Sequence, residues 1–419
     1  MSLPKKVVST TAELLAACKA VDTRHLVVRG EIANMPSIRL APGIILSGDG
    51  DGASISFAAG SDGLQLSSDN EVRNLRLETS LDKRAIFNDY TVDGLGCIRL
   101  QGITSLGQVQ IVARGRVFSG HVVVDGLDVI AADARGQPEQ PRGFGVRVIQ
   151  GAFTLWNLQP DESVVISAHV TGLSVGRPCA PVLGSGIFLC GAGVGGGRLV
   201  AQLLETGAVY SDGRIAPGTP DVITGGVFTV HGAVVDLVHN LGPVVTYGVN
   251  DMVLDNWGAV DRWIAEDKLT SYGPSGIGFV NFGSLNELTV NAPIETFGKG
   301  ARGFNVYDGT LNQATFDRIT THADGAVGIQ ISKPIGRLVV RRGIETFGGT
   351  GDSLVKGVVV TLSAIGLSVK PGGSARSIDI EGGVTANGQG IAPIELHGTI
   401  DFLRISGGAK ATGGGFDKT

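Results

Sequence analysis

The chain has 419 residues, of which 65 are glycine and 42% are apolar, a composition too hydrophobic for a disordered protein and without the Gly-X-Y period of collagen. Its net charge is −5 and it has no basic block, which argues against nucleic acid as a partner. It has no apolar run of about 18 residues, so we expect a soluble protein with no membrane partner.

The first predicted element is a short helix near the N-terminus. Thr10 and Glu13 have the spacing of a capping box and stand directly before an apolar run that starts at Leu14. We expect residues 1–22 to form a capping segment whose helix covers the first coil of a β-structure and shields its unpaired strand edges. The residues before Glu13 do not have the apolar core of a secretory signal, which favours a cytoplasmic protein or one whose signal has been removed.

Short runs rich in Val, Ile and Leu, separated by Gly, Asn and Asp, follow in the first half of the chain. Examples are HLVVRGEI at 25–32 and VVVDGLDVIAADA at 122–134, and both patterns are typical of β-strands between tight turns. Polar breaks at 132–143, 178–186 and 209–221 predict longer loops that protrude from one edge, and such loops often carry function.

The second half contains a regular repeat. Five segments follow one another at a constant step of 25 residues, and they begin at Val244, Leu269, Ile294, Ile319 and Ile344. Weaker copies begin at Val384 and Ala409, after one irregular interval. Strand-like alternation with Gly turns at this period predicts one coil of a β-solenoid per repeat. We therefore expect an all-β fold, a single right-handed parallel β-helix over residues 23–419, with regular 25-residue coils from about residue 244.

The repeat also predicts which side chains point inward. The position two residues after each start holds Ser or Thr, and because residues i and i+2 share one face of a strand, these hydroxyls should be buried with the apolar starts. The predicted hydroxyl ladder consists of Thr246, Ser271, Thr296, Thr321 and Thr346. Nine residues after three of the starts stand Gly278, Gly303 and Gly328, which we expect at tight corners with positive φ.

The stretches RLAPGIILSGDGDGASISF (39–57) and NEVRNLRLET (70–79), with the coils from 244 to 358, resemble the right-handed parallel β-helix (pectate-lyase-like) superfamily over nearly the whole chain. The resemblance implies this fold and, as the commonest substrates, sugar polymers processed by lyases, hydrolases or epimerases on a strand face. The catalytic signatures of that family are missing, since neither His121 nor His231 stands in a Gly-His-Gly motif and no Arg-x-Pro-x-x-Arg occurs. No catalytic residue is therefore transferred, because one fold hosts many functions.

Alternation places the residues one and three positions after each start on the outer face, as neighbouring columns of acids and rings. The candidate catalytic residues are Glu295, His322, Asp324 and Glu345. The candidate substrate-binding residues are Tyr247, Trp257, Tyr272, Phe297, Lys299, Arg302 and Tyr307. Sugar faces pack on rings, while carboxylates and His transfer protons. Acids two coils apart, on the order of 9.6 Å, lie near the upper end of the ~6.5–9.5 Å separation of an inverting glycosidase.

Structural alternatives stay open for each of these features. The rings can stack as part of the solenoid, and the acids can be solvated surface charge. The charged segment 255–268 is either one wall of a cleft, with Lys268 or Arg262 as the charge stabiliser, or a solvent-facing edge. No metal-ligand spacing occurs, so we expect no cofactor, with calcium bound by three carboxylates as the alternative.

These patterns favour a carbohydrate-active protein, a polysaccharide lyase or glycoside hydrolase that acts on a polysaccharide or oligosaccharide in a surface cleft. The alternative is a non-catalytic β-solenoid that serves as a binding, surface or assembly module. The missing signatures favour the second hypothesis, whereas the adjacent columns of acids and rings favour the first. A homo-oligomer that forms through the C-terminal end, where the tail is rich in Gly and Thr, also stays open.

Overall fold

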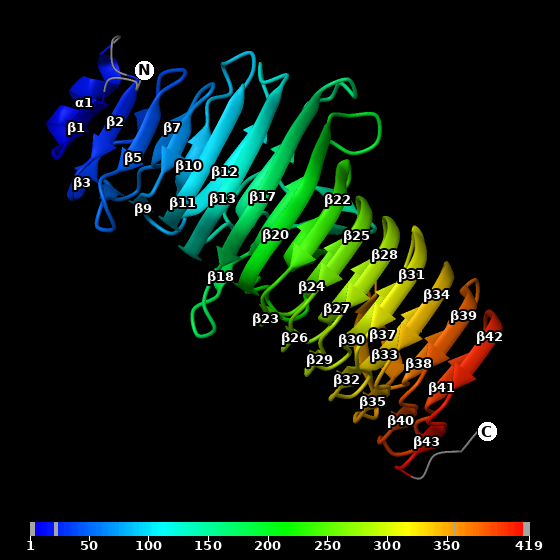
Figure 1. The fold of residues 1–419 in the computed structure, drawn as a ribbon. Helices are drawn as coiled ribbons and strands as arrows, with labels where there is room; N and C mark the ends of the chain where they lie inside the picture. Colours follow the sequence, from blue (N-terminus) through cyan, green and yellow to red (C-terminus); the bar gives the residue numbers. More distant parts are fainter. Residues whose placement is uncertain (1–4, 21–23, 356, 414–419) are drawn as a thin grey trace. The chain divides into compact units, whose positions relative to one another are not determined.

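The chain folds as a parallel β-solenoid, the fold class that the repeat predicts (Figure 1). The computed structural model describes residues 5–20, 24–355 and 357–413. They belong to two compact units: unit 1 comprises 1–137, 150–208 and 230–234, and unit 2 comprises 138–149, 209–229 and 235–419. That residues 23–419 form one continuous right-handed helix stays a prediction, and residue 23 itself lies outside the described residues.

Unit 1 contains strands of two parallel sheets joined by short turns. Strands of the first sheet are β1 (Lys5–Val8), β2 (His25–Val28), β3 (Glu31–Met35), β5 (Ile45–Gly48), β6 (Ser54–Phe57), β8 (Glu71–Arg73), β9 (Arg76–Glu78), β11 (Cys97–Leu106), β13 (Gly120–Ala131), β17 (Val165–Val175) and β18 (Val182–Leu183). Strands of the second sheet are β4 (Ile38–Arg39), β7 (Leu64–Leu66), β10 (Arg84–Asn88), β12 (Gln108–Ala113), β16 (Gly151–Asn157) and β19 (Ser185–Cys190). The chain passes between the units within β20 (Arg198–Asp212) and β22 (Ala233–Asn240).

The predicted N-terminal helix is confirmed as α1 (Thr11–Lys19). The hydroxyl of Thr10 accepts a hydrogen bond from the Glu13 amide at 3.2 Å, and the Glu13 carboxylate accepts one from the Ser9 amide at 2.8 Å. Strand β1, which the sequence analysis did not predict, precedes the helix and pairs in parallel with β2. In the described part of the chain, no helix has both the length and the apolar character needed to cross a bilayer.

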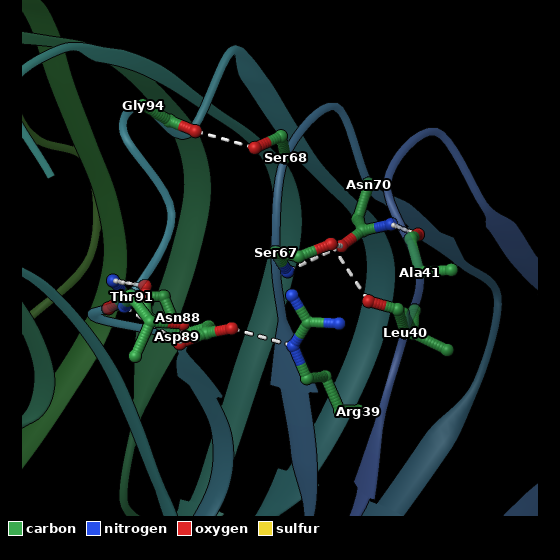
Figure 2. A network of polar contacts seen from close by, with 10 residues as sticks. All are labelled: Arg39, Leu40, Ala41, Ser67, Ser68, Asn70, Asn88, Asp89, Thr91 and Gly94. Carbon is green, nitrogen blue, oxygen red and sulfur yellow. Dashed lines mark hydrogen bonds and ion pairs between the residues drawn. The ribbon is translucent and has the colours of Figure 1, made fainter. Parts of the chain in front are cut away.

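Polar side chains link the turns of unit 1 to one another (Figure 2). The Asn70 amide donates to the carbonyl of Ala41 at 2.8 Å. The Asp89 carboxylate accepts from Arg39 at 2.6 Å and from the Thr91 amide at 2.8 Å. Burial raises the pKa of Asp89, but these hydrogen bonds outweigh it and hold the pKa below its usual value. The network thus stabilises the turns, because its buried polar side chains form hydrogen bonds with one another and with the backbone of neighbouring turns.

Unit 2 contains the regular coils, each with two strands of the first sheet and one of the second. Strands of the first sheet are β23 (Val244–Thr246), β25 (Ala259–Ala265), β26 (Leu269–Ser271), β28 (Ser284–Val290), β29 (Ile294–Thr296), β31 (Thr310–Phe316), β32 (Ile319–Thr321), β34 (Pro334–Val340), β35 (Ile344–Thr346), β39 (Ser374–Ile380), β40 (Val384–Ala386), β42 (Thr399–Ile405) and β43 (Ala409–Ala411). Strands of the second sheet are β21 (Val222–Thr229), β24 (Asp251–Asn256), β27 (Ile277–Asn281), β30 (Arg302–Val306), β33 (Val327–Ile331), β38 (Leu367–Val369) and β41 (Ile394–Leu396).

The predicted repeat matches the pairing of strands in unit 2. The five repeat starts pair in parallel, each with the next, from Val244 to Ile344. Ile344 then pairs with Val384, and the longer interval contains the antiparallel hairpin β36 (Thr350–Val355) and β37 (Val358–Ser363). A second hairpin, β14 (Arg142–Gly143) with β15 (Val146–Val148), belongs to the same unit.

The predicted hydroxyl ladder is confirmed, since all five of its Ser and Thr side chains are buried. The hydroxyls of Thr246, Thr321 and Thr346 donate to backbone carbonyls of Asp251, Ala326 and Ala364, whereas those of Ser271 and Thr296 have no hydrogen-bond partner among the described residues. The explanation for the three repeat glycines is wrong, because they do not have positive φ. A Cβ at Gly278 would lie 2.3 Å from the Ile294 side chain, so glycine is required there by lack of space.

Candidate functional site

Five rings form a stack on the surface of unit 2, which we call the ring ladder. Its members are Tyr247, Tyr272, Phe297, His322 and Phe347. Each ring directly follows one of the short strands β23, β26, β29, β32 and β35, so the strand register stacks the rings. Neighbouring ring centroids are 4.5–5.4 Å apart and the ring planes differ by 3–13°.

The ring ladder faces outward, as the alternation predicts. Tyr272, Phe297 and Phe347 are 48%, 38% and 44% exposed, although large apolar side chains are usually buried. The faces of the inner rings are covered by their neighbours, and only the ring edges meet solvent. A sugar that lies on the ladder therefore contacts a strip of ring edges and cannot stack on one ring face.

Glu295 and His322 are brought together beside the ring ladder. The Glu295 carboxylate lies 2.9 Å from Nε2 of His322 and accepts a hydrogen bond from Nζ of Lys268 at 2.7 Å. Burial raises the pKa of Glu295, but the hydrogen bonds from Lys268 and His322 outweigh it and hold the pKa below its usual value. Glu295 is therefore ionised at neutral pH.

The other two candidate acids have partners of their own. Glu345 accepts a hydrogen bond from the Arg318 guanidinium at 2.6 Å and one from the Asn387 amide at 3.3 Å. Asp324 lies on the turn after β32 and accepts from the backbone amide of Gly349 at 2.7 Å. Of the four predicted catalytic residues, only Glu295 and His322 thus contact each other directly in the described structure.

Three predicted substrate-binding residues do not lie on the open surface. Trp257 and Tyr307 are 4% and 6% exposed, and Arg302 of β30 is fully buried. Two hairpins cover them: Phe144 of the β14–β15 hairpin packs edge-on against Trp257 at 5.1 Å and stacks on Phe282 at 4.4 Å, and Leu354 of β36 contacts Arg302. Alternation predicts an exposed column here, whereas segments distant in the sequence cover it. Lys299 is exposed on its turn, as expected.

The charged segment 255–268 is divided between the interior and the surface of unit 2. Asp255 and Trp263 are fully buried, whereas Arg262 is exposed. Lys268 lies beside the ring ladder, where it forms an ion pair with Glu295. The segment contains strand β25, whose buried residues do not alternate strictly. A two-residue period therefore does not identify the apolar face of this strand.

The alternation does not predict that three ionisable residues of unit 2 are buried. Asp251 and Asp255 of β24 and Arg302 of β30 have no exposed surface. In the sheet, Arg302 pairs with Ile277 and Val327. The position of charged Arg302 in a column that is otherwise apolar is the sequence signal for this buried cluster.

No family model, curated protein or solved structure matches this chain. Among the residues with assigned positions, no three His, Cys, Asp or Glu side chains are arranged to hold a metal ion. Function is therefore inferred from the geometry of the residues themselves.

Proposed function

We propose that this protein binds an extended polysaccharide along the ring ladder and does not cleave it. The supporting observation is the exposure of Tyr272, Phe297 and Phe347, whose edges make an apolar strip over successive coils. The coils repeat at about 4.8 Å, which is comparable to the advance of an extended sugar chain per residue. Successive sugars can thus contact successive rings.

Ion pairs beside the strip supply the polar part of such a site. Lys268 with Glu295 and Arg318 with Glu345 form pairs at 2.7 and 2.6 Å. Each pair keeps donors and acceptors that can serve sugar hydroxyls or uronate carboxylates. An exposed ion pair is worth only about 0–1 kcal/mol, so a bound sugar can rearrange it at small cost.

The state of the acids favours binding over cleavage. Glycoside hydrolysis needs one carboxyl group that is protonated near neutral pH and a second that is ionised. The lowered pKa of Glu295 makes it unsuitable as the acid. Asp324 and Glu345 are engaged by the Gly349 amide and the Arg318 guanidinium.

A polysaccharide lyase is the second candidate, because one contact fits a general base. The Glu295 carboxylate lies 2.9 Å from Nε2 of His322, and a carboxylate in this position can fix the imidazole tautomer. With the proton on Nε2, Nδ1 is the acceptor that would remove the proton next to a uronate carboxylate. The exposed edge of His322, 32% of its side chain, is consistent with this role.

Removing one ring of the ladder is the test of binding. We expect Phe297→Ala to weaken binding of polygalacturonate about tenfold, because the minority of contact residues whose truncation costs more than about 1 kcal/mol are mostly central and often aromatic. Affinity electrophoresis in gels with polygalacturonate or a neutral soluble glucan measures the effect. Phe402→Ala is the matched control, because Phe402 is 57% exposed on β42 of the same unit and lies outside the ladder. Equal retardation of the Phe297→Ala and wild-type proteins would contradict the proposal.

Cleavage is tested separately on the same polymers. We expect neither new ultraviolet absorbance, which marks an unsaturated lyase product, nor new reducing ends. If absorbance does appear, Glu295→Gln and His322→Ala should each reduce its rate about 10²–10⁴-fold. That result would replace the binding proposal with the lyase, whereas activity that survives both changes would remove this dyad from consideration.

A further inference from the structure

A small cavity lies inside unit 2, on the face of the second sheet that the two hairpins cover. Its volume is about 40 Å³, room for a few water-sized groups. Strands β21, β24 and β27 supply its floor, and Phe144 and Leu354 of the hairpins supply its cover. Its wall includes Asp255 and three rings, those of Trp257, Phe282 and Tyr307.

Two ionisable side chains, Asp255 in the cavity wall and Arg302 beside the cavity, are buried without pairing with each other. Arg302 donates weakly from one terminal nitrogen to the Leu354 carbonyl at 3.5 Å and to the Gly300 carbonyl at 3.3 Å. Its Nε and its other terminal nitrogen have no hydrogen-bond partner among the described residues. The guanidinium carbon lies 5.7 Å from the ring centre of Tyr307, which also lines the cavity.

Asp255, in the cavity wall, is also buried without a hydrogen-bond partner in the described part of the chain. Neither of its carboxyl oxygens accepts a hydrogen bond of ordinary geometry from the described residues. Burial raises the pKa of Asp255 well above its usual value, and the Trp257 indole offsets part of that rise. A protonated Asp255 is a hydrogen-bond donor as well as an acceptor.

An unpaired buried charge such as that of Arg302 destabilises a fold. An arginine buried without a carboxylate loses its hydration and gains little in return. Native proteins pair such groups or replace them with apolar residues, and they tolerate exceptions where function requires them. Arg302 occupies a column that holds Ile277 and Val327 in the neighbouring coils, so an apolar residue fits that column.

A wider pocket of about 210 Å³ adjoins the cavity. Ser275 and Leu354 line both spaces, and the Leu354 amide donates to the Ser275 hydroxyl at 3.0 Å between them. The outer pocket is mainly apolar, with Pro217, Pro220 and Pro274 in its wall. It also contains Asp352, whose carboxylate accepts from Thr361 at 3.0 Å.

We propose that the cavity and the adjoining pocket form one binding site for a small sugar acid, with Arg302 as the partner of its carboxylate. The ligand occupies the outer pocket and reaches Arg302 when the contact between Ser275 and Leu354 gives way. Arg302 has two unused donor nitrogens on a planar group, which suits a carboxylate. Asp352 binds hydroxyl groups of the sugar in the outer pocket, and Asp255 with the rings of Trp257 and Phe282 contacts the carboxylate end that enters the inner cavity.

This site is separate from the ring ladder and takes a different ligand. The ladder presents ring edges to solvent for a polymer, whereas the pocket has room for one sugar and holds the charge that would select an acid. The two proposals can therefore fail independently. Phe297→Ala, which tests the ladder, should leave binding at the pocket unchanged.

Glucuronate and glucose are the probes, because they differ by one carboxylate. We expect glucuronate to raise the thermal unfolding midpoint of the full-length protein and glucose to have a much smaller effect. Arg302→Met should bind glucuronate about thirtyfold more weakly or worse, as expected when one partner of a buried charge pair is removed. Without ligand, the same variant should unfold at the wild-type temperature or above it, because the substitution removes an unpaired buried charge.

The opposite results overturn the proposal. Equal shifts with both sugars, no shift with either, or wild-type glucuronate affinity in Arg302→Met would each do so. If Arg302→Met does not fold, Asp255→Leu takes its place, because it also removes an unpaired buried group. A loss of affinity of about tenfold in that variant supports the site, and wild-type affinity overturns it.

Discussion

Replacing Asp251 with asparagine is expected to stabilise the protein by about 4 kcal/mol at pH 8 and to leave its stability unchanged below about pH 4. Burial raises the pKa of Asp251 from 3.8 to about 7, although hydrogen bonds from Thr224 and from the Gly213 and Gly248 amides oppose the rise. Ionising this carboxyl group in the folded state therefore costs free energy. A neutral amide at the same position carries no such cost.

The sign follows from the proton count of the two states. Between pH 3.8 and about 7, folded Asp251 keeps a proton that the unfolded chain has released, so its contribution to stability falls as the pH rises. Above about 7 the group is ionised in both states and the contribution is constant. Asparagine can keep the contacts, because its oxygen can accept from the two amides and its nitrogen can donate to Thr224.

Urea unfolding, followed by tryptophan fluorescence from about pH 4 to about pH 8, measures this effect. The informative quantity is the difference between variant and wild type, because the burial-lowered pKa values of His25 and His231 give an opposite trend in both proteins. Asp236→Asn is the control, since Asp236 is exposed on β22 and should follow the wild type. A difference that does not change with pH would show that Asp251 titrates normally.

The regular coils could be predicted from the sequence because their pairing repeats. A 25-residue step brings Leu269 beside Ile294 and Ile294 beside Ile319, and each further coil repeats the same contacts. Alternation then gives the buried hydroxyls and the outward rings of the ladder. Unit 1 has no such constant step, because its turns and loops differ in length. For that reason the sequence predicts strands in unit 1 but not their exact bounds.

The covered face of unit 2 could not be predicted in the same way. Its cover comes from residues 142–148 and from an insertion between Ile344 and Val384, and neither belongs to the repeat. Local alternation gives the side of the sheet on which Trp257 lies, but it cannot show that Phe144 packs on that side. The contacts that bury Trp257, Tyr307 and Arg302 are thus long-range in sequence.

The strand β25 shows a second limit of alternation. Its buried residues are Val260, Trp263 and Ala265, and the next coil repeats this spacing at Leu285, Leu288 and Val290. The step from 260 to 263 breaks the two-residue period, so a strictly alternating pattern assigns Trp263 to the wrong face. Only the repeated apolar positions in neighbouring coils reveal the break.

Trp263→Ala is expected to destabilise unit 2 by about 3–5 kcal/mol, the usual loss for a large aromatic side chain removed from a core. The indole is fully buried, packs edge-on against Phe279 at 5.1 Å and donates from Nε1 to the Asn240 side chain at 2.8 Å. Truncation removes the ring packing and the hydrogen bond and leaves a cavity inside the coil. The midpoint of urea unfolding should fall accordingly.

Arg262→Ala is the matched control, because Arg262 is the preceding residue on β25 and is exposed. It should change stability by no more than about 0.5 kcal/mol. Trp263→Phe separates the two contributions, since it keeps an aromatic ring and loses the bond to Asn240. If Trp263→Ala costs no more than Arg262→Ala, the indole lies on the surface and the register of β25 is wrong. In that case the inward position of Phe279, which rests on the same packing, would also be wrong.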